Sequence, residues 1–336
     1  MHMTRVDNAL VVTSIAAPND CLRALASDSS QRGARFIVIG DRASPPDFDL
    51  AGCDFYSPAR QEALEYHYSK IAPWRHYARK NIGYLEAARS GVTRIYETDD
   101  DNFPLPGFWL EEEQRQLHHV CGSAWFNVYQ WYGADAWPRG FPLRLIKTSP
   151  TAEVEQVDKP AGRVAVWQGL VANDPDVDAI FRMTRNGEVV FQDHGTVVLG
   201  PGVWCPFNSQ NTCWEKVAFP LMYLPATCSF RATDIIRSYV ALRCLAAIGL
   251  NLAFTGVTAR QVRNDHDLLK DFRDEIAIYL HAEAIRDSLN ALNLSNDARA
   301  ASQNVRICYE ALIAMEVVHE RELVFLDAWR EDLASV

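Results

Sequence analysis

Three consecutive carboxylates are the strongest sign of chemistry in this chain. Asp99, Asp100 and Asp101, called the acidic triplet below, follow a short segment rich in β-branched residues, 92–98, that reads as a buried strand. Adjacent carboxylates repel one another, and a divalent cation such as Mg²⁺ or Mn²⁺, which prefers oxygen ligands, relieves that repulsion. Such a metal also neutralises charge on a departing diphosphate. A solvated acidic loop is the alternative, and the buried strand directly before the triplet favours the metal site.

Two basic residues offer a partner for phosphate. Arg79 and Lys80 lie on the predicted helix that precedes this strand. A guanidinium fork and an ammonium group both suit phosphate oxygens. A solvated helix face would explain the pair equally well, and both interpretations stay open.

Four further polar residues occupy positions where ligands bind. Asp41 and Arg42 follow the predicted strand 35–39, and open α/β sheets bind ligands beyond the carboxyl ends of their strands. Asn208 and Gln210 lie in a run of amides and hydroxyls inside apolar sequence. Such groups suit sugar hydroxyls, whose hydrogen bonds must be met once they are buried, although a plain turn is an equal alternative.

Asp234 and His266 are weaker candidates. Asp234 opens a predicted helix, where the helix dipole alone favours a carboxylate, and it could also serve as a base or a sugar ligand. His266 stands between two carboxylates and could complete a metal shell or bind phosphate. A lone histidine is more often neither.

The elements that must position these residues alternate between strand and helix. Buried strands are predicted at 9–15, 35–39 and 92–98, and helices at 21–30 and, broken near Pro73, at 58–90. In the second half of the latter segment, Ala78, Ile82 and Leu85 share one apolar face. This alternation predicts an α/β fold with a Rossmann-like mixed sheet flanked by helices, and polar residues gather where its strands end.

The rest of the chain reads as a region of loops and strands followed by a region of helices. The middle, from about Cys121 to Met222, is rich in strands, Trp, Gly and Pro, and helical signals return from Thr233 onward. Helices are predicted at 234–249, 267–292 and, as one or two amphipathic helices, 296–332. We therefore expect a ligand-binding domain at 1–265 and a helical C-terminal extension at 266–336.

Composition excludes several classes of protein. The 336 residues carry a formal net charge of -10, so nucleic acid is an unfavourable partner. No apolar run reaches the roughly 18 residues of a transmembrane helix, so we expect no integral membrane segment. The eight cysteines form no CxxC pair, which argues against a zinc cluster or a disulfide framework and for buried thiols in a cytoplasmic protein.

Four longer runs carry a family resemblance. They are Arg79 to Leu85, Tyr96 to Asn102, Val166 to Ala179 and Pro206 to Thr212, and together they resemble the STELLO glycosyltransferases over about residues 8–270. A more distant resemblance is to the reversibly glycosylated polypeptides, which include UDP-arabinopyranose mutases. Their Arg-Gly-Tyr-Pro motif is similar to the run Arg139 to Pro142, where Phe141 replaces Tyr.

The resemblance implies a GT-A-like nucleotide-sugar-binding fold, a UDP-sugar donor and Mn²⁺ or Mg²⁺. The acceptor would be a glycan or a small molecule, and the helical extension leaves room for a homo-oligomer. The expected metal ligands are Asp99, Asp101 and His266; the expected nucleotide-sugar contacts are Asp41, Arg42, Arg79, Lys80, Asp99, Asp100, Asn208 and Gln210; the expected catalytic residues are Asp234 and Arg139.

Glycosyl transfer is the main hypothesis, and three alternatives stay open. The chain could be a mutase or self-glycosylating protein that acts through Arg139, since the glycosylated arginine of the more distant family would fall there. It could be a non-catalytic nucleotide-sugar-binding protein that binds a partner through its C-terminal helices. A Mg²⁺-dependent phosphohydrolase also uses acidic clusters, but fits the Trp- and amide-rich middle less well.

Overall fold

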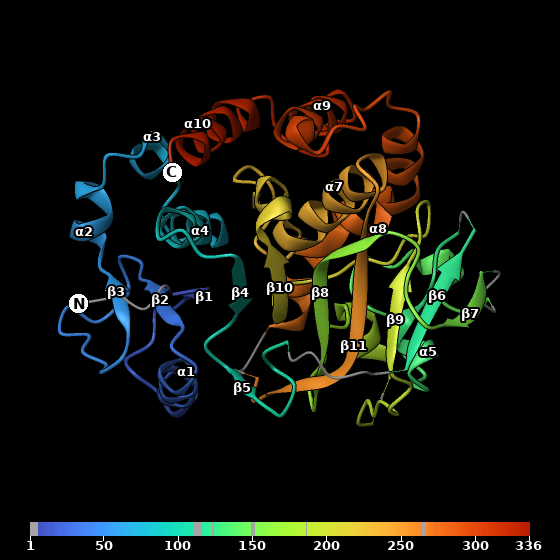
Figure 1. Ribbon diagram of the computed structural model, residues 1–336, viewed down its shortest axis with the longest axis horizontal. Coiled ribbons are helices and arrows are strands. Elements are labelled where there is room, and N and C mark those ends of the chain that lie inside the picture. The colour runs from blue at the N-terminus through green and yellow to red at the C-terminus, as the bar shows by residue number, and fades with distance from the viewer. Residues whose placement is uncertain (1–5, 111–115, 123, 149–151, 186, 264–266) are drawn as a thin grey trace.

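The computed structural model describes residues 6–110, 116–122, 124–148, 152–185, 187–263 and 267–336. Its centre is one large mixed β-sheet (Figure 1). The first half of the sheet is parallel, in the order β3-β2-β1-β4. Its strands are β1 (Asn8–Thr13), β2 (Arg35–Ile39), β3 (Asp54–Tyr56) and β4 (Arg94–Thr98).

The second half of the sheet begins where β10 pairs antiparallel with β4. The order continues β10-β8-β11-β9-β6-β7, and β5 pairs with the far end of β11. The strands are β5 (Asn102–Pro104), β6 (Leu117–Cys121), β7 (Glu153–Val157), β8 (Arg163–Ala172), β9 (Thr196–Leu199), β10 (Asn211–Glu215) and β11 (Leu250–Gln261). Because β10 runs against β4, residues that lead into β10 lie beside residues that leave β4.

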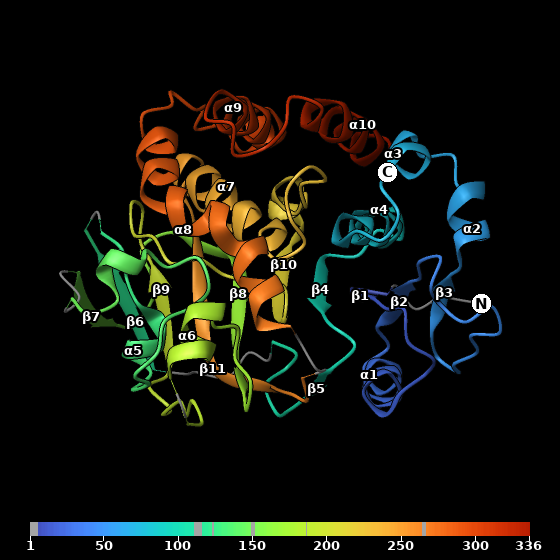
Figure 2. The same ribbon diagram turned by 180° about the vertical axis from the view of Figure 1, so that it is seen from behind.

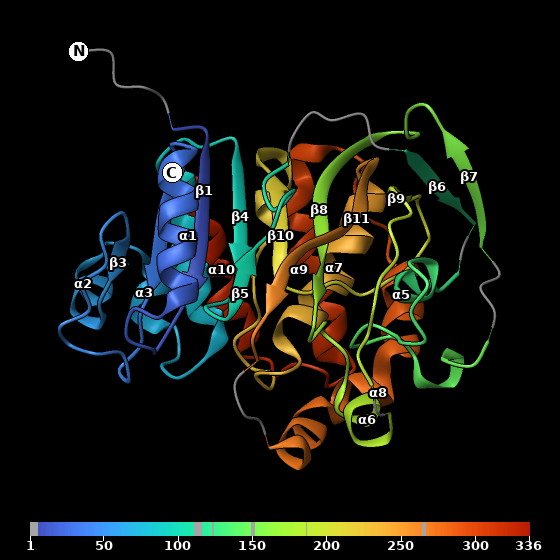
Figure 3. The ribbon, with the colours of Figure 1, turned by 90° about the horizontal axis from the view of Figure 1, so that it is seen from below.

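Helices cover both faces of the parallel half. Along β1, Leu10 and Val12 pack with α1 (Asp20–Gln31), while Ala9 and Val11 face the side of α4 (Lys80–Arg89), as the period of two in a strand requires. Figure 3 shows α1 in front of the sheet and α7, α9 and α10 behind it. Helix α4 packs tightly on β1: a Cβ on Gly83 would lie 2.4 Å from a methyl carbon of Val11.

The C-terminal helices lie along one side of the molecule (Figure 2). They are α7 (Thr233–Ala247), α8 (Leu268–Asn290), α9 (Ala301–Ala314) and α10 (Glu322–Ala334); the shorter helices are α2 (Pro58–Ala63), α3 (His67–Ile71), α5 (Val128–Trp131) and α6 (Ala179–Thr184). Helix α10 contacts α3, which lies much earlier in the chain. The Asp332 carboxylate accepts hydrogen bonds from the backbone N–H groups of His67 and Tyr68. None of the described helices is both long and apolar enough to span a bilayer.

The expected α/β architecture is confirmed, including the mixed sheet flanked by helices and the helical C-terminal region. The strands predicted at 9–15, 35–39 and 92–98 correspond to β1, β2 and β4, and the helices predicted at 234–249 and 267–292 to α7 and α8. The sequence predicted that α4 buries one apolar face. In the structure every residue from Lys80 to Ala87 is buried, so the helix is buried on all sides over this stretch. The prediction of helix from Thr233 onward missed β11, the longest strand of the described chain.

Candidate functional site

A cavity of about 660 Å³ lies at the carboxyl ends of β1, β2 and β4. Its size is within the range of roughly 300–1,000 Å³ that small-molecule sites occupy. The lining carries charge of both signs: its acids are Asp41, Asp99, Asp100, Asp101, Asp176 and Asp234, and its arginines are Arg75, Arg79, Arg139, Arg231 and Arg263. Among these lining residues the six carboxylates outnumber the five guanidinium groups.

Each carboxylate of the acidic triplet is hydrogen-bonded to a different part of the fold. Asp99 Oδ1 accepts hydrogen bonds from the Tyr77 hydroxyl at 2.6 Å and the Lys80 ammonium at 3.2 Å. Asp100 Oδ2 accepts one from the hydroxyl of Ser14, directly after β1. Asp101 Oδ2 accepts one from the side-chain amide of Gln261, the last residue of β11, at 3.0 Å.

The triplet carries more negative charge than its described neighbours compensate. Burial raises the pKa of Asp101 to about 7, and repulsion from Asp99 adds to the effect. Burial also raises the pKa of Asp100. The second oxygen of Asp101, Oδ1, is buried without a hydrogen-bond partner among the described residues. The described residues contain no group of three His, Cys, Asp or Glu side chains already arranged for a metal, but crowded carboxylates with an orphaned oxygen fit a bound cation.

Arg79 lines the cavity and Lys80 lies beside it, but the side chains of both are already bonded. Lys80 is fully buried, and its ammonium donates to the Tyr77 hydroxyl, the Thr98 carbonyl and Asp99. The Arg79 guanidinium donates to the Gln61 side chain and the Ala72 carbonyl, and burial lowers its pKa to about 10. Direct contact of either residue with a diphosphate stays a prediction, and the bonding favours a role in holding Asp99 and the cavity wall.

Asp41 lines the cavity at the end of β2, while Arg42 does not line it. The Asp41 carboxylate accepts from the backbone N–H of Arg42 at 2.6 Å and of Arg75 at 2.7 Å. The Arg42 side chain is exposed, and its guanidinium carbon lies 4.8 Å from the centre of the Trp74 ring. The structure therefore brings Asp41, but not the Arg42 side chain, to the site.

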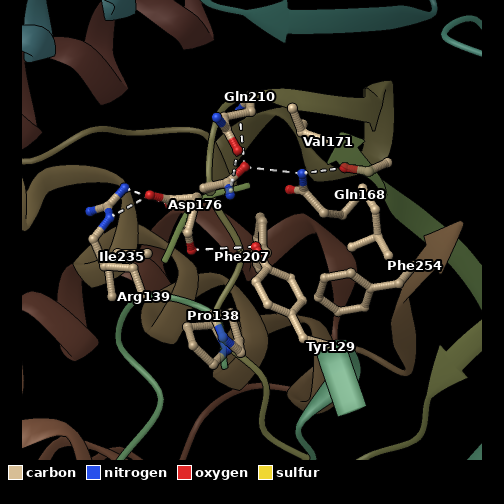
Figure 4. Close-up of a pocket in the computed structure, with 14 residues that line it drawn as sticks. Tyr129, Pro138, Arg139, Gln168, Val171, Asp176, Phe207, Gln210, Ile235 and Phe254 are labelled. Carbon is tan, nitrogen blue, oxygen red and sulfur yellow. Dashed lines mark hydrogen bonds and ion pairs between the residues drawn. The ribbon is translucent and has the colours of Figure 1, made fainter. Parts of the chain in front are cut away.

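Arg139 lies at the centre of a buried ion network. Its guanidinium donates through Nε and Nη2 to the Asp176 carboxylate at 2.8 and 2.7 Å (Figure 4). It also donates through Nη1 and Nη2 to the Asp234 carboxylate at 3.0 and 2.9 Å. The fifth N–H is taken by the Arg231 carbonyl. All five guanidinium N–H groups are therefore bonded, and the opposite charges of Asp176 and Asp234 outweigh burial and hold the pKa of Arg139 well above its usual value.

Arg231 and Arg263 are cavity cations that the sequence analysis did not select. Helix α8 holds both: Glu275 accepts from Arg231 Nε at 2.8 Å, and Asp271 pairs with Arg263 at 3.0 Å. Burial lowers the pKa of Arg263 to about 10, and repulsion from the Arg182 and Arg231 guanidinium groups adds to it. His266, the expected third metal ligand, lies outside the described residues.

Asn208 and Gln210 lie at the seam between β4 and β10. Gln210 lines both the large cavity and a second pocket, which Figure 4 shows, whereas Asn208 lines only the second pocket. That pocket measures about 10 Å³, roughly room for a single water and far too little for a sugar. In this geometry Asn208 therefore does not face a sugar, and its predicted sugar contact finds no support here.

The last helix holds the loop that leads to Arg231 and Asp234. The Glu322 carboxylate on α10 is fully buried and accepts from the Tyr223 hydroxyl, the backbone N–H of Ala226 and both the N–H and hydroxyl of Thr227. This carboxylate therefore ties the path of the cavity wall to the C-terminal region.

A neighbouring buried carboxyl gives a testable pH dependence. Burial raises the pKa of Asp178, which caps α6 through the Phe181 N–H, to about 6 from an ordinary 3.8. A carboxyl whose pKa is raised on folding stabilises the protein at low pH, and that contribution is lost as pH rises from about 4 through 6. Asn caps a helix as well as Asp does, but its amide nitrogen cannot accept the Trp137 indole N–H that donates to Asp178 Oδ2 at 2.7 Å, which is a loss independent of pH. On top of that constant loss, Asp178→Asn should gain stability relative to wild type as the pH rises through this window.

The gain between pH 4 and pH 7 should approach about 3 kcal/mol, because one pKa unit corresponds to about 1.4 kcal/mol. Urea unfolding of both proteins at pH 4 and pH 7 measures the difference. The same change at Asp267, an exposed cap of α8, is the control. A stability difference at Asp178 that does not vary with pH would refute this account of its ionisation.

The mixed sheet, the helices around it and the acidic cluster at the end of β4 define the class of the fold, a GT-A-like α/β protein. Comparison with known families supports the sequence resemblance. A family model described as STELLO glycosyltransferases matches residues 231–336. Two proteins of Arabidopsis thaliana, named probable glycosyltransferases STELLO1 and STELLO2, are 28% identical over 97% of the chain and 27% identical over 99% of it.

The resemblance to the STELLO glycosyltransferases is therefore confirmed over nearly the whole chain. The chain spans 44% and 45% of the length of these two relatives. Two solved structures are also similar, each 13% identical and matched over 83% of this chain: a mycobacterial protein (75% of that chain, TM-score 0.42) and a glucosyl-3-phosphoglycerate synthase of M. tuberculosis (81%, TM-score 0.41). Because both TM-scores are low, the fold assignment rests on the strand order itself.

Proposed function

We propose that the chain is a metal-dependent glycosyltransferase that uses a nucleoside diphosphate sugar, with UDP as the nucleotide. The observation that carries the proposal is the cavity in which the acidic triplet shares one lining with Arg231 and Arg263. Carboxylates for a metal and arginines for phosphate are the two groups that a nucleotide diphosphate needs. The similarity to named glycosyltransferases supports the same class of reaction.

Asp99 and Asp101 are the residues that would hold Mn²⁺ or Mg²⁺. Both line the cavity, and the unpartnered Oδ1 of Asp101 is the oxygen with unused capacity. A bound divalent cation supplies charge neutralisation at the leaving diphosphate. Tyr77 and Lys80 hold Asp99 in place for this role through their hydrogen bonds to its Oδ1.

The remaining lining residues would contact different parts of the substrate. We assign Asp41 to the base or ribose, because it lies at the end of β2, and Arg231 and Arg263 to the diphosphate. Asp234 accepts from Arg139 with both oxygens and keeps further lone pairs for a sugar or acceptor hydroxyl. Closing such a cavity around its substrate also excludes water, which strengthens these polar contacts.

The geometry weighs against transfer to Arg139 itself. A guanidinium must lose a proton and offer a free nitrogen to attack a sugar carbon. All five N–H groups of Arg139 are bonded, and two carboxylates stabilise its charged form. Mass spectrometry after incubation with UDP-sugars should therefore show no hexose or pentose adduct on Arg139.

The C-terminal helices serve the site, in this proposal, rather than acting as a separate docking module. We retain the division into a nucleotide-sugar-binding domain, 1–265, and a helical extension, 266–336. Helix α8 supplies the acids that hold Arg231 and Arg263, and Glu322 of α10 holds the loop before them. These contacts support an extension that completes the cavity wall.

The test is thermal stability with UDP, GDP, CDP and their sugars, each with and without Mn²⁺. A ligand at about 100 times its Kd should add roughly 2.7 kcal/mol, visible as a higher melting temperature. We expect stabilisation by UDP and a UDP-sugar only with the metal, and slow release of UDP from the sugar donor. No shift with any nucleotide would overturn the proposal, and binding without any turnover would favour a non-catalytic binding protein.

A further inference from the structure

Four buried amides form a single hydrogen-bonded line that ends on the acidic triplet. Gln168 Nε2 donates to Asn208 Oδ1 at 3.1 Å, and Asn208 Nδ2 donates to Gln210 Oε1 at 3.4 Å. Gln210 Nε2 donates to Gln261 Oε1 at 3.0 Å, and Gln261 Nε2 donates to Asp101 Oδ2 at 3.0 Å. We call these four residues the amide line. They cross the sheet from β8, past the start of β10, to the end of β11.

The direction of the line is fixed at both ends. At its start, Gln168 Nε2 also faces the carbonyls of Gly169 and Asn211, so this atom must be the nitrogen. Asn208 Oδ1 also accepts the backbone N–H of Gln210 at 2.9 Å, so this atom must be the oxygen. At the far end the Asp101 carboxylate can only accept, which requires the nitrogen of Gln261 to face it.

The amide line determines how the Asp101 carboxylate is oriented, and therefore where its second oxygen lies. One oxygen of Asp101 is committed to Gln261, and the other is buried with no hydrogen-bond partner among the described residues. Each amide in the line is at most 8% exposed, although Gln210 and Gln261 also line the cavity. The rotation of the Asp101 carboxylate is therefore set by residues as far away as β8.

We propose that the amide line is a positioning device that orients Asp101 for the cation of the nucleotide site. This inference rests on the proposed function, and it deepens it by giving Gln168, Asn208 and Gln261 a defined part in the site. Groups that orient a metal ligand typically contribute 10–100-fold to metal affinity. The device also explains why these amides bond to one another, although Gln210 and Gln261 line the cavity.

The sharpest test is Asn208→Asp, which replaces one donor with an acceptor of the same shape. The carboxylate at position 208 cannot donate to Gln210 Oε1. The side-chain amide of Gln210 therefore rotates and presents its nitrogen to that carboxylate. Gln261 must then turn as well and presents its oxygen to Asp101, where two oxygens repel. We expect the dissociation constant for Mn²⁺, measured by electron paramagnetic resonance with UDP present, to rise about 10-fold or more.

Two further variants separate positioning from general damage. Gln261→Met keeps an unbranched chain of similar length and removes the last donor, and should weaken Mn²⁺ binding to a similar degree. Asn304→Asp makes the same atom exchange at a buried amide of α9 that bonds only to Ser295 among the described residues. It should lower the melting temperature and leave Mn²⁺ affinity unchanged when measured well below that temperature.

The outcomes are distinguishable. Weaker Mn²⁺ binding in Asn208→Asp and Gln261→Met, with normal binding in Asn304→Asp, supports the positioning device. Wild-type affinity in all three variants, or an equal loss in all three, overturns it while leaving the nucleotide site in place. A wild-type protein that binds no Mn²⁺ with UDP present overturns the proposed function, and the device with it.

Discussion

Asp101→Asn should abolish metal-dependent nucleotide binding. The amide keeps the shape of the side chain, and its oxygen can still accept from Gln261, so the fold has no reason to change. What disappears is the negative charge at the orphaned oxygen, the feature that fits a divalent cation. The roughly 2.7 kcal/mol of stabilisation expected from UDP with Mn²⁺ at about 100 times Kd should vanish in thermal unfolding and in calorimetric titration.

The unfolding free energy of Asp101→Asn without nucleotide or metal shows whether the substitution damages the fold. Removing one of three crowded carboxylates relieves repulsion, so its unfolding free energy should equal or exceed that of wild type. Asp158→Asn, at an exposed carboxylate after β7, is the matched control and should bind like wild type. Retained metal-dependent binding in Asp101→Asn would remove this residue from the site.

Arg139→Met should cost about 3–5 kcal/mol of unfolding free energy. The side chain is buried between Asp176 and Asp234, and its removal leaves Asp234 without its described cation and Asp176 with the weaker Arg231 pair at 3.9 Å. Breaking a buried pair by removing one partner is destabilising on this scale because the remaining charge is uncompensated. Urea unfolding at pH 7 measures the loss as a lower midpoint with little change of slope.

The control uses an arginine in an exposed pair. Arg144 bonds Glu283, but its side chain is 76% exposed, and such pairs contribute about 0–1 kcal/mol. Arg144→Met should therefore unfold nearly as wild type does. Similar small losses in both variants would show that the network around Arg139 is not the structural centre that its geometry indicates.

The parts of the site that could be predicted from sequence are those fixed by local pattern. An apolar β-branched run followed by three aspartates predicts a buried strand with carboxylates at its end, and β4 with the acidic triplet has this form. Asp41 after β2 follows from the same rule. Each of these predictions needs only a few neighbouring residues.

The parts that could not be predicted depend on pairings across the sheet. Gln261 reaches Asp101 only because β11 pairs with β5, and β11 itself was missed. Arg231 carries no local signal, since its role comes from Glu275 on a helix further along the chain. The bonding of Asn208 within the sheet, rather than toward a substrate, likewise depends on Gln168 in another strand.

The anchoring of the 223–227 loop by Glu322 has a consequence for the order in which the protein becomes competent. The loop is synthesised well before α10, and four of its hydrogen bonds wait for that one carboxylate. Until α10 has emerged from the ribosome and docked, the wall that carries Arg231 and Asp234 lacks its anchor. The growing chain can therefore build its sheet before α10 exists, yet this wall of the cavity takes its final shape only once α10 has docked.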